Sequence, residues 1–270
     1  MEGFTPSSTF QRKQLERIDI PEKHFVYYQG GSSKGYAKKV LHEGYWYKLS
    51  AGTFNAQAEV VASRLAKYTN IGASVKYEMC VVNGEYATKS KDFISNMRYE
   101  TVKGMYAKVY GKSIDGLIQE VSGIPLLMCV RETVLKYIGL DIMASPTLDR
   151  LCLLLMFDAL VLNDDRHFNN IKFIQTSTGT WELAPAFDFD CSLYSCVEDL
   201  DSLEEYSKPS QPFFPTHSEQ VELVHSLSKI RLNVSPFNVD MLLEGVWDDK
   251  HEIGKKEIKD YLVKVKEGLK

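Results

Sequence analysis

Acidic and amide side chains follow the most apolar stretch of the chain. The run from Leu151 to Leu162 is strongly apolar, Asp165 comes shortly after it, and Asn170 and Asp188 lie further on. Phosphoryl transfer needs these residue types, because one carboxylate must lie near the attacking hydroxyl while an amide oxygen and a second carboxylate hold a metal ion on the ATP phosphates. The spacing therefore indicates a phosphotransfer centre built from Asp165, Asn170 and Asp188.

Two predicted strands explain how Asp188 could return to the side of Asn170. The strands Ile171 to Gln175 and Thr180 to Leu183 are joined by a turn that ends in Gly179, which is typical of a β-hairpin. A simpler interpretation is that the Asp and Asn residues only cap the preceding helix. The hairpin and the second Asp together favour the phosphotransfer centre.

A segment rich in glycine and serine lies between two predicted strands near the N-terminus, Phe25 to Tyr28 and Tyr36 to Leu41. Glycine lets the backbone approach phosphates closely, so the N–H groups of such a loop can bind them. The pattern is neither a P-loop nor a strict G-x-G-x-x-G motif, and an ordinary hairpin loop is the alternative. The nucleotide contacts predicted in this loop are Gly30, Gly31, Ser32, Ser33 and Lys34.

Lys48 lies near the end of the predicted strand Tyr45 to Leu49, one strand beyond the glycine-rich segment. Kinases place there the lysine that contacts the phosphates that are not transferred. A helix predicted over residues 56–66 carries Glu59 in its second turn. Glu59 is therefore the candidate ion-pair partner of Lys48. Its rivals for that role are Glu78 and Glu85.

The rest of the pattern predicts a hairpin followed mainly by helices. Val75 to Val82 and Glu85 to Ser90 flank Asn83-Gly84, which is a strong hairpin signal. Asp149 and Asp158 interrupt an apolar helix and are interpreted as helix-end or packing residues. The predicted helices are Tyr99 to Tyr110, Ile114 to Val121, Leu126 to Ile138, Thr147 to Leu162 and Lys255 to Lys270. The predicted caps are Thr53 or Asn55 for the helix over residues 56–66, Thr216 with Glu219, and Ser235 before Pro236.

The motifs resemble those of a known family. The string Asp165-Arg166-His167-x-x-Asn170 and the later run Ala184 to Tyr194, with Asp188 inside it, are similar to motifs of the HipA-like serine/threonine kinases, most closely those of the compact cell-translocating kinase type. The resemblance implies an α+β, two-lobed protein-kinase-like fold with a small antiparallel β lobe, a helical lobe and ATP between them. It also implies ATP and Mg²⁺ as cofactors and a Ser or Thr hydroxyl of a protein as the acceptor.

The resemblance assigns roles to the motif residues. Asp165 would position or deprotonate the acceptor hydroxyl, Asn170 and Asp188 would bind magnesium, and Lys48 would hold the phosphates. His167 belongs to the same catalytic loop and is expected to orient it, through a hydrogen bond from the ring to the backbone, rather than transfer a proton. Two further carboxylates could share the metal or the base role: Asp164 and Asp190.

The same resemblance divides the chain. The N-lobe is expected over residues 1–94 and the C-lobe over residues 95–270, and the backbone of the joining segment should bind adenine. We expect autophosphorylation at Ser32 or Ser33 and a toxin or effector role. The 24 residues before Phe25 are too few for the extra N-terminal subdomain of the longer family members, which argues against a paired antitoxin of the usual kind. The joining segment is predicted to present Lys91, Asp92 and Phe93.

Two other functions stay open. The catalytic loop is also similar to that of phosphoinositide kinases, so a lipid or small-molecule kinase is one alternative. The acidic segment Glu198 to Glu205 offers no basic surface for an anionic lipid, however. The other alternative is a pseudokinase that binds nucleotide and serves as an interaction module. The joint presence of Lys48, Asp165, Asn170 and Asp188 argues against it.

Composition narrows the class of protein further. The chain has 44% hydrophobic and 25% charged residues, a net charge of -4 and a pI near 5.9, which is typical of a globular protein that does not bind nucleic acid or an anionic membrane. No leader peptide or membrane-spanning stretch is recognised, so a cytoplasmic protein is expected, or one exported without a signal. Five cysteines without C-x-x-C spacing are interpreted as reduced residues rather than a metal site or disulfides: Cys80, Cys129, Cys152, Cys191 and Cys196.

Overall fold

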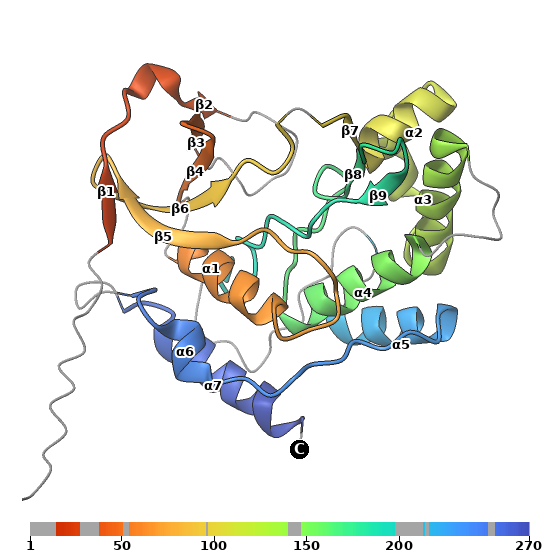
Figure 1. Cartoon of the computed structure of the whole chain (residues 1–270). Coiled ribbons are helices and arrows are strands. Elements are labelled where there is room, and N and C mark those ends of the chain that lie inside the picture. The colour runs from red at the N-terminus through yellow and green to blue at the C-terminus, as the bar shows by residue number, and fades with distance from the viewer. Residues whose placement is uncertain are drawn as a thin grey trace, which may run out of the picture.

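The computed structural model describes residues 15–27, 38–50, 54–95, 97–139, 147–197, 213, 216–247 and 252–269. Within them, a six-stranded sheet with helix α1 forms one lobe, and a three-stranded sheet with helices α2 to α5 forms the other (Figure 1). The predicted α+β, two-lobed fold is therefore confirmed. The division of the chain between residues 94 and 95 stays a prediction.

The larger sheet has the strand order β1-β5-β6-β4-β3-β2. All its neighbouring strands are antiparallel except β1 and β5, which run parallel with Arg17 opposite Val81. The sheet is antiparallel as expected, apart from this one parallel pair at its edge, where a strand of three residues gives too short a pattern to recognise in the sequence. The strands are β1 (Glu16–Ile18), β2 (Val26–Tyr27), β3 (Lys38–His42), β4 (Tyr45–Leu49), β5 (Tyr77–Val82) and β6 (Glu85–Lys91).

The turn between β5 and β6 forms at Asn83-Gly84, as predicted. Both residues have positive φ, 51° and 88°, which Asn and Gly tolerate better than other residues. The Asn83 amide also bonds to the backbone of Ile20, accepting from its N–H at 2.8 Å and donating to its carbonyl at 2.7 Å. The hairpin thereby fixes the segment that follows β1.

Helix α1 (Asn55–Ala66) packs between the sheet and the other lobe. Its sequence is almost wholly apolar or small, and even its polar members are buried. Phe54 occupies the N-cap position without a side-chain hydrogen bond, so the prediction of Asn55 as the cap is wrong. Asn55 begins the helix instead, because its amide is used elsewhere, and Thr53 lies outside the described residues.

The second lobe contains the smaller sheet, of order β7-β8-β9. Tyr99 begins a strand rather than a helix because it pairs with Ile174, a contact that the local sequence does not reveal. The segment from Ile114 is a 3-10 helix and not the predicted α-helix. The elements are β7 (Tyr99–Thr101), α2 (Val102–Tyr110), η2 (Ile114–Gln119), α3 (Gly123–Ile138), α4 (Thr147–Leu160), β8 (Lys172–Gln175), β9 (Trp181–Leu183) and α5 (His217–Leu227); η1 (Glu22–His24) precedes β2.

The C-terminal helix α6 (Val239–Leu243) lies beside α1, and helix α7 (Lys255–Glu267) packs against α6 (Figure 1). Arg64 of α1 donates to the carbonyls of Leu242, at 2.8 Å, and Glu244, at 2.7 Å. Asn238 caps α6, so the predicted cap at Ser235 is wrong. The predicted cap at Thr216 is confirmed, since its hydroxyl accepts from the N–H of Glu219. The contacts of Arg64 with Leu242 and Glu244 thus help to hold α1, the helix that carries Glu59, in place.

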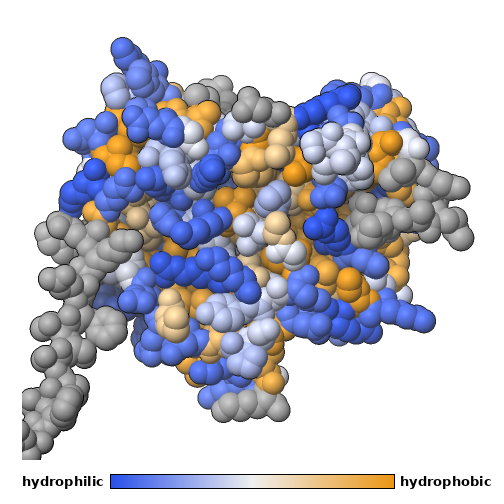
Figure 2. Space-filling view, in the orientation of Figure 1, coloured by the Kyte–Doolittle hydropathy of each residue, from blue (hydrophilic) through white to orange (hydrophobic). Residues whose placement is uncertain are grey.

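Hydrophilic side chains cover much of the face seen in Figure 2, and the apolar ones lie among them in small groups. None of the helices among the described residues has both the length and the apolar character needed to cross a bilayer.

Candidate active site

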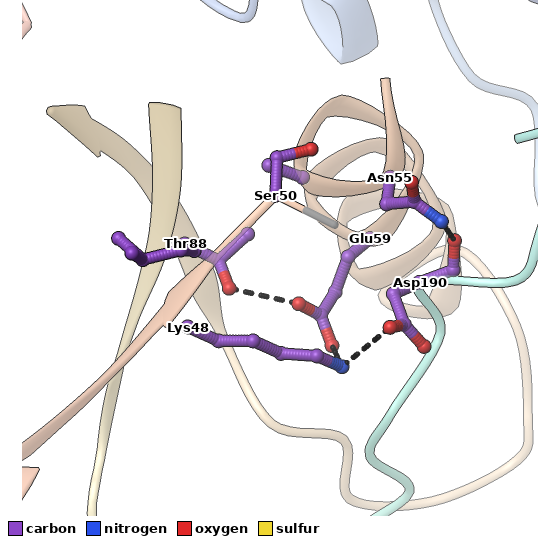
Figure 3. A pocket seen from close by; sticks show the side chains of 8 residues that line it. Lys48, Ser50, Asn55, Glu59, Thr88 and Asp190 are labelled. Carbon is purple, nitrogen blue, oxygen red and sulfur yellow. Dashed lines mark hydrogen bonds and ion pairs between the residues drawn. The ribbon is translucent and has the colours of Figure 1, made fainter. Parts of the chain in front are cut away.

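Lys48 of β4 lies at the centre of an ion cluster between the lobes (Figure 3). Its ammonium is 2.5 Å from Oδ1 of Asp188, 2.8 Å from Oδ2 of Asp190 and 3.6 Å from Oε1 of Glu59. The second carboxylate oxygen of Glu59 accepts a hydrogen bond from Thr88 of β6 at 2.8 Å. The structure therefore brings Lys48, Glu59 and Asp188 together, and it places Glu78 with Lys76 instead.

The pKa values of the ionisable groups in this cluster are strongly shifted. Burial alone would lower the pKa of Lys48, but Asp188, Asp190 and Glu59 raise it well above its usual value. Burial acts to raise the pKa of Asp188, yet Lys48, Lys39 and His167 bring it below its usual range. Burial raises the pKa of Glu59 more than Lys48 lowers it. Lys48 and Asp188 are thus the fixed charges of the site at neutral pH.

Asp188 adopts a conformation that few side chains tolerate. Its φ is 61°, in the left-handed region, where Asp is among the less disfavoured residues. The N–H of Asp188 donates to the hydroxyl of Tyr77 on β5 at 3.1 Å. Residues held in such conformations cluster at functional sites, because the surrounding structure must stabilise them. Tyr77 therefore helps to aim the Asp188 carboxylate at Lys48.

The loop from Asn163 to Asn170 is organised by a buried ion pair. The guanidinium of Arg166 donates to both carboxylate oxygens of Asp158, at 2.8 and 2.9 Å, and both side chains are almost completely buried. Asp158 also accepts from the amide of Asn163, whose own oxygen accepts from the N–H of Asp165 at 3.2 Å. Asp158, interpreted from the sequence as a packing residue, is in fact the anchor of this loop.

Arg166 also joins the two residues expected to bind metal. Its Nη1 donates to the carbonyls of Asn170, at 3.1 Å, and Phe187, at 2.6 Å, and Phe187 directly precedes Asp188. The side-chain amide of Asn170 in turn donates to the carbonyl of Asp165 at 3.3 Å. One buried guanidinium thus fixes the backbones of Asn170 and Asp188 relative to each other.

Asp165 has the electrostatic character of a base. Burial, followed by the charges of Asp188, Asp190 and Asp164, raises the pKa of Asp165 to about 7. About a quarter of its side chain is exposed, 27%, so a substrate can reach it. A carboxylate with a pKa near neutrality can accept a proton and later release it.

His167 lies beside Asp165 without a close ion pair, since its Nε2 is 3.9 Å from Oδ2 of Asp165. Burial lowers the pKa of His167 below its ordinary value, which favours the neutral imidazole. Its Nδ1 is buried and shows no hydrogen-bond partner of ordinary geometry among the described residues. The backbone of His167 orders the loop instead, because its carbonyl accepts from the N–H of Asn170 at 2.8 Å.

The residues expected to join the lobes lie at the end of β6 and just after it. Lys91 is the last residue of β6 and pairs with Tyr45. The N–H of Asp92 donates to the carbonyl of Gly44 at 3.0 Å, so this donor is already used and is not available to adenine. Phe93 packs against Phe187 with ring centroids 5.7 Å apart. The glycine-rich segment with Gly30, Gly31, Ser32, Ser33 and Lys34 lies outside the described residues.

Several residues at the site were not anticipated from the sequence. Lys172 of β8 places its ammonium 4.6 Å from the centre of the Phe187 ring, and burial lowers its pKa. The amide of Asn55 donates to the carbonyl of Asp190 at 3.0 Å. No local pattern predicts Tyr77, Lys172 or Asn55. Arg166 stands inside the motif, but nothing in its polar sequence surroundings indicates that it is buried.

Comparisons with known proteins agree with this architecture. No protein-family model and no curated protein matches the sequence. Among solved structures, the Helicobacter pylori proinflammatory kinase CtkA matches with a TM-score of 0.50 and 16% identity over 94% of this chain and 99% of that chain. HipA of a Shewanella oneidensis toxin–antitoxin system, solved with HipB and operator DNA, matches with a TM-score of 0.47 and 12% identity. That match covers 92% of this chain and 67% of the HipA chain. The resemblance inferred from the motifs is therefore confirmed in the fold, which the chain shares with the H. pylori kinase CtkA.

Proposed function

We propose that the chain is an ATP- and magnesium-dependent kinase of HipA-like type that phosphorylates Ser or Thr hydroxyls of proteins. One observation carries the proposal. Lys48 contacts Glu59 of α1 and Asp188, which lies 140 residues further along the chain. Such a cluster between two lobes is what a kinase needs to hold ATP phosphates and their metal ion.

The residues at the site suit magnesium. Mg²⁺ prefers oxygen ligands, usually one or two carboxylates together with phosphate oxygens and water. Asp188, whose pKa is lowered, offers an ionised carboxylate, and Asn170 offers an amide oxygen held nearby through Arg166. Asp188 and Asn170 would hold the ion, and its charge would offset that of the phosphate oxygens when ATP is bound.

The chain's own groups then have separate tasks. Lys48 is expected to leave its contact with Asp188 and hold the non-transferred phosphates, while Glu59 keeps it oriented. Asp165 would accept the proton of the attacking hydroxyl, which its raised pKa suits. The imidazole of His167, which is neutral at pH 7, would line the acceptor site and would not act as a proton donor. Asp158 and Arg166 would maintain the distance between base and metal ligands.

The substrate class can be tested in a lysate. Host-cell proteins treated to inactivate their own kinases would be incubated with ATP and either wild-type protein or Asp165→Asn, and phosphopeptides compared by mass spectrometry. New phosphoserine or phosphothreonine sites with the wild type alone would support the proposal. Phosphorylated lipids or metabolites without phosphopeptides would favour a lipid or small-molecule kinase, and no product in either fraction would favour a pseudokinase.

Autophosphorylation and a toxin or effector role are part of this proposal and rest on the motif resemblance. A phosphate on Ser32 or Ser33 adds about two negative charges close to the ATP triphosphate, so nucleotide affinity should fall. Phosphosite mapping of the purified wild type should find one of the two serines modified. The Asp165→Asn form should lack the modification, and equal modification of both forms would contradict self-phosphorylation.

A further inference from the structure

Two thiols meet immediately beside the ion cluster. Cys196 donates to the sulfur of Cys191 across 2.7 Å, and the two residues stand only five positions apart. A disulfide holds its sulfurs about 2.05 Å apart, so a small movement separates these thiols from a covalent bond. Cys191 is buried and Cys196 is partly exposed, so a small reagent can reach one member of the pair.

The loop between the two cysteines is tightly constrained. Leu193 and Tyr194 both have positive φ, 51° and 69°, which is unfavourable for side chains of their size. The hydroxyl of Ser195 donates to the carbonyl of Asp190 at 2.5 Å, folding the loop back on itself. The surrounding structure therefore stabilises a strained backbone at Leu193 and Tyr194, in the loop that holds these two sulfurs together.

We propose that Cys191 and Cys196 form a reversible disulfide with a small-molecule disulfide such as oxidised glutathione as the electron acceptor. Cys196 loses its proton and attacks one glutathione sulfur, which breaks that disulfide and releases one glutathione thiol. Cys191 then loses its proton and attacks the sulfur of Cys196, releasing the second glutathione thiol. Two protein thiols are oxidised and one glutathione disulfide is reduced.

The surroundings of the two thiols determine which of them attacks glutathione first. The close contact with Cys196, followed by burial, raises the pKa of the Cys191 thiol, because two sulfurs this close cannot both ionise, so Cys191 stays protonated until the second step. Asp164 lies close enough to both sulfurs to form a three-residue group with the spacing of a metal site. A tetrahedral zinc site would need the sulfurs to move apart, since Zn–S bonds are about 2.3 Å long, whereas the disulfide needs them to move together. The observed contact favours the disulfide.

The bridge would act on the neighbouring site, an effect that rests on the proposed kinase function. Asp190 directly precedes Cys191, and its carboxylate holds Lys48 at 2.8 Å. Closing the loop stabilises the arrangement in which Lys48 contacts acidic side chains rather than phosphates, and a state stabilised in this way is depopulated less easily by a ligand. Oxidation should therefore weaken ATP binding several-fold.

The first test is chemical and does not depend on kinase activity. The whole protein would be equilibrated with defined ratios of reduced and oxidised glutathione, acid-quenched and alkylated, and its cysteine peptides examined by mass spectrometry. The peptide that holds both Cys191 and Cys196 should lose two hydrogens as the buffer becomes oxidising, and regain them with reductant. Cys129→Ser is the matched control, because Cys129 is partly exposed but distant in the sequence, and it should leave the transition unchanged.

Three outcomes would overturn the proposal. Both thiols could stay free at every glutathione ratio, or Cys196 could stop at the mixed disulfide with glutathione, or zinc alone could bind stoichiometrically and block alkylation of both. The link to the ion cluster is tested by the affinity for an ATP analogue in oxidised and reduced protein, with identically treated Cys196→Ser as control. Equal affinities in the two forms would refute that link, while a protein that binds no nucleotide at all would refute the kinase assignment instead.

Discussion

Replacing Asp165 by Asn should change how stability depends on pH. Burial and the neighbouring carboxylates raise the pKa of Asp165 from its ordinary 3.8 to about 7 in the folded protein. Below about pH 4, folded and unfolded chains both carry the proton. As the pH rises the unfolded chain releases its proton first, so the free energy of unfolding falls until the pH passes the folded pKa near 7. Asn cannot ionise, so the free energy of unfolding of the Asp165→Asn variant does not fall in this way as the pH rises.

The magnitude follows from the same values. A difference of about three pKa units corresponds to at most about 4 kcal/mol at 1.36 kcal/mol per unit, and the part that develops between pH 5 and pH 8 is at most about 2.5 kcal/mol. The Asp165 side chain is 27% exposed, so solvent screens some of this energy. We expect Asp165→Asn to gain about 1–2 kcal/mol of unfolding free energy relative to the wild type between pH 5 and pH 8.

Urea unfolding of both proteins at several pH values, with a chelator present, measures this gain. Any effect of the substitution that does not depend on pH cancels in the comparison. Asp115→Asn is the control, because Lys103 is the main cause that lowers the pKa of Asp115, which therefore stays ionised over the whole range. A wild-type and Asp165→Asn difference that is constant from pH 5 to pH 8, like that of the control, would refute the account of Asp165.

Two further substitutions test the metal ligand and the anchor of the catalytic loop. Asp188→Ala should abolish the tightening of ATP binding by magnesium, because it removes a carboxylate ligand; calorimetry that gives the same magnesium response in both proteins would exclude this role. Asp158→Ala should lower the unfolding free energy by roughly 3–5 kcal/mol, because it leaves the Arg166 charge buried and unpaired. Asp158→Leu with Arg166→Met should recover much of that stability in urea unfolding but not nucleotide-dependent activity, and recovery of both would show that the pair does not position the site.

The sequence predicts the parts of the fold that depend on neighbouring residues. The turn at Asn83-Gly84 forms because these two types accept positive φ, and the hydroxyl cap at Thr216 forms because the N–H of Glu219 lies within its reach. Regular local geometry carries this information. Lys48 and Glu59 could be named as a candidate pair before the structure was known for another reason, because their positions match those of the phosphate-contacting lysine and its helix glutamate in kinases.

Contacts between distant segments could not be predicted in this way. Tyr99 lies in a strand only because Ile174 pairs with it, and a three-residue stretch does not reveal such a partner. Asp158 looked like an interruption of an apolar helix, since the Arg166 that satisfies it enters from the following loop. The amide of Asn55 bonds to Asp190 rather than capping its own helix for the same reason. The residues that aim the site are thus fixed by tertiary contacts.

Transfer of labelled γ-phosphate from ATP, in the presence and absence of magnesium, tests the central claim most directly. Wild-type protein and Asp165→Asn would be compared on the same protein substrate, with nucleotide affinity measured in parallel. We predict magnesium-dependent transfer by the wild type, a loss of roughly a hundredfold or more in Asp165→Asn, and similar ATP affinity in the two proteins. Turnover by Asp165→Asn close to that of the wild type, or transfer by neither protein, would contradict the account.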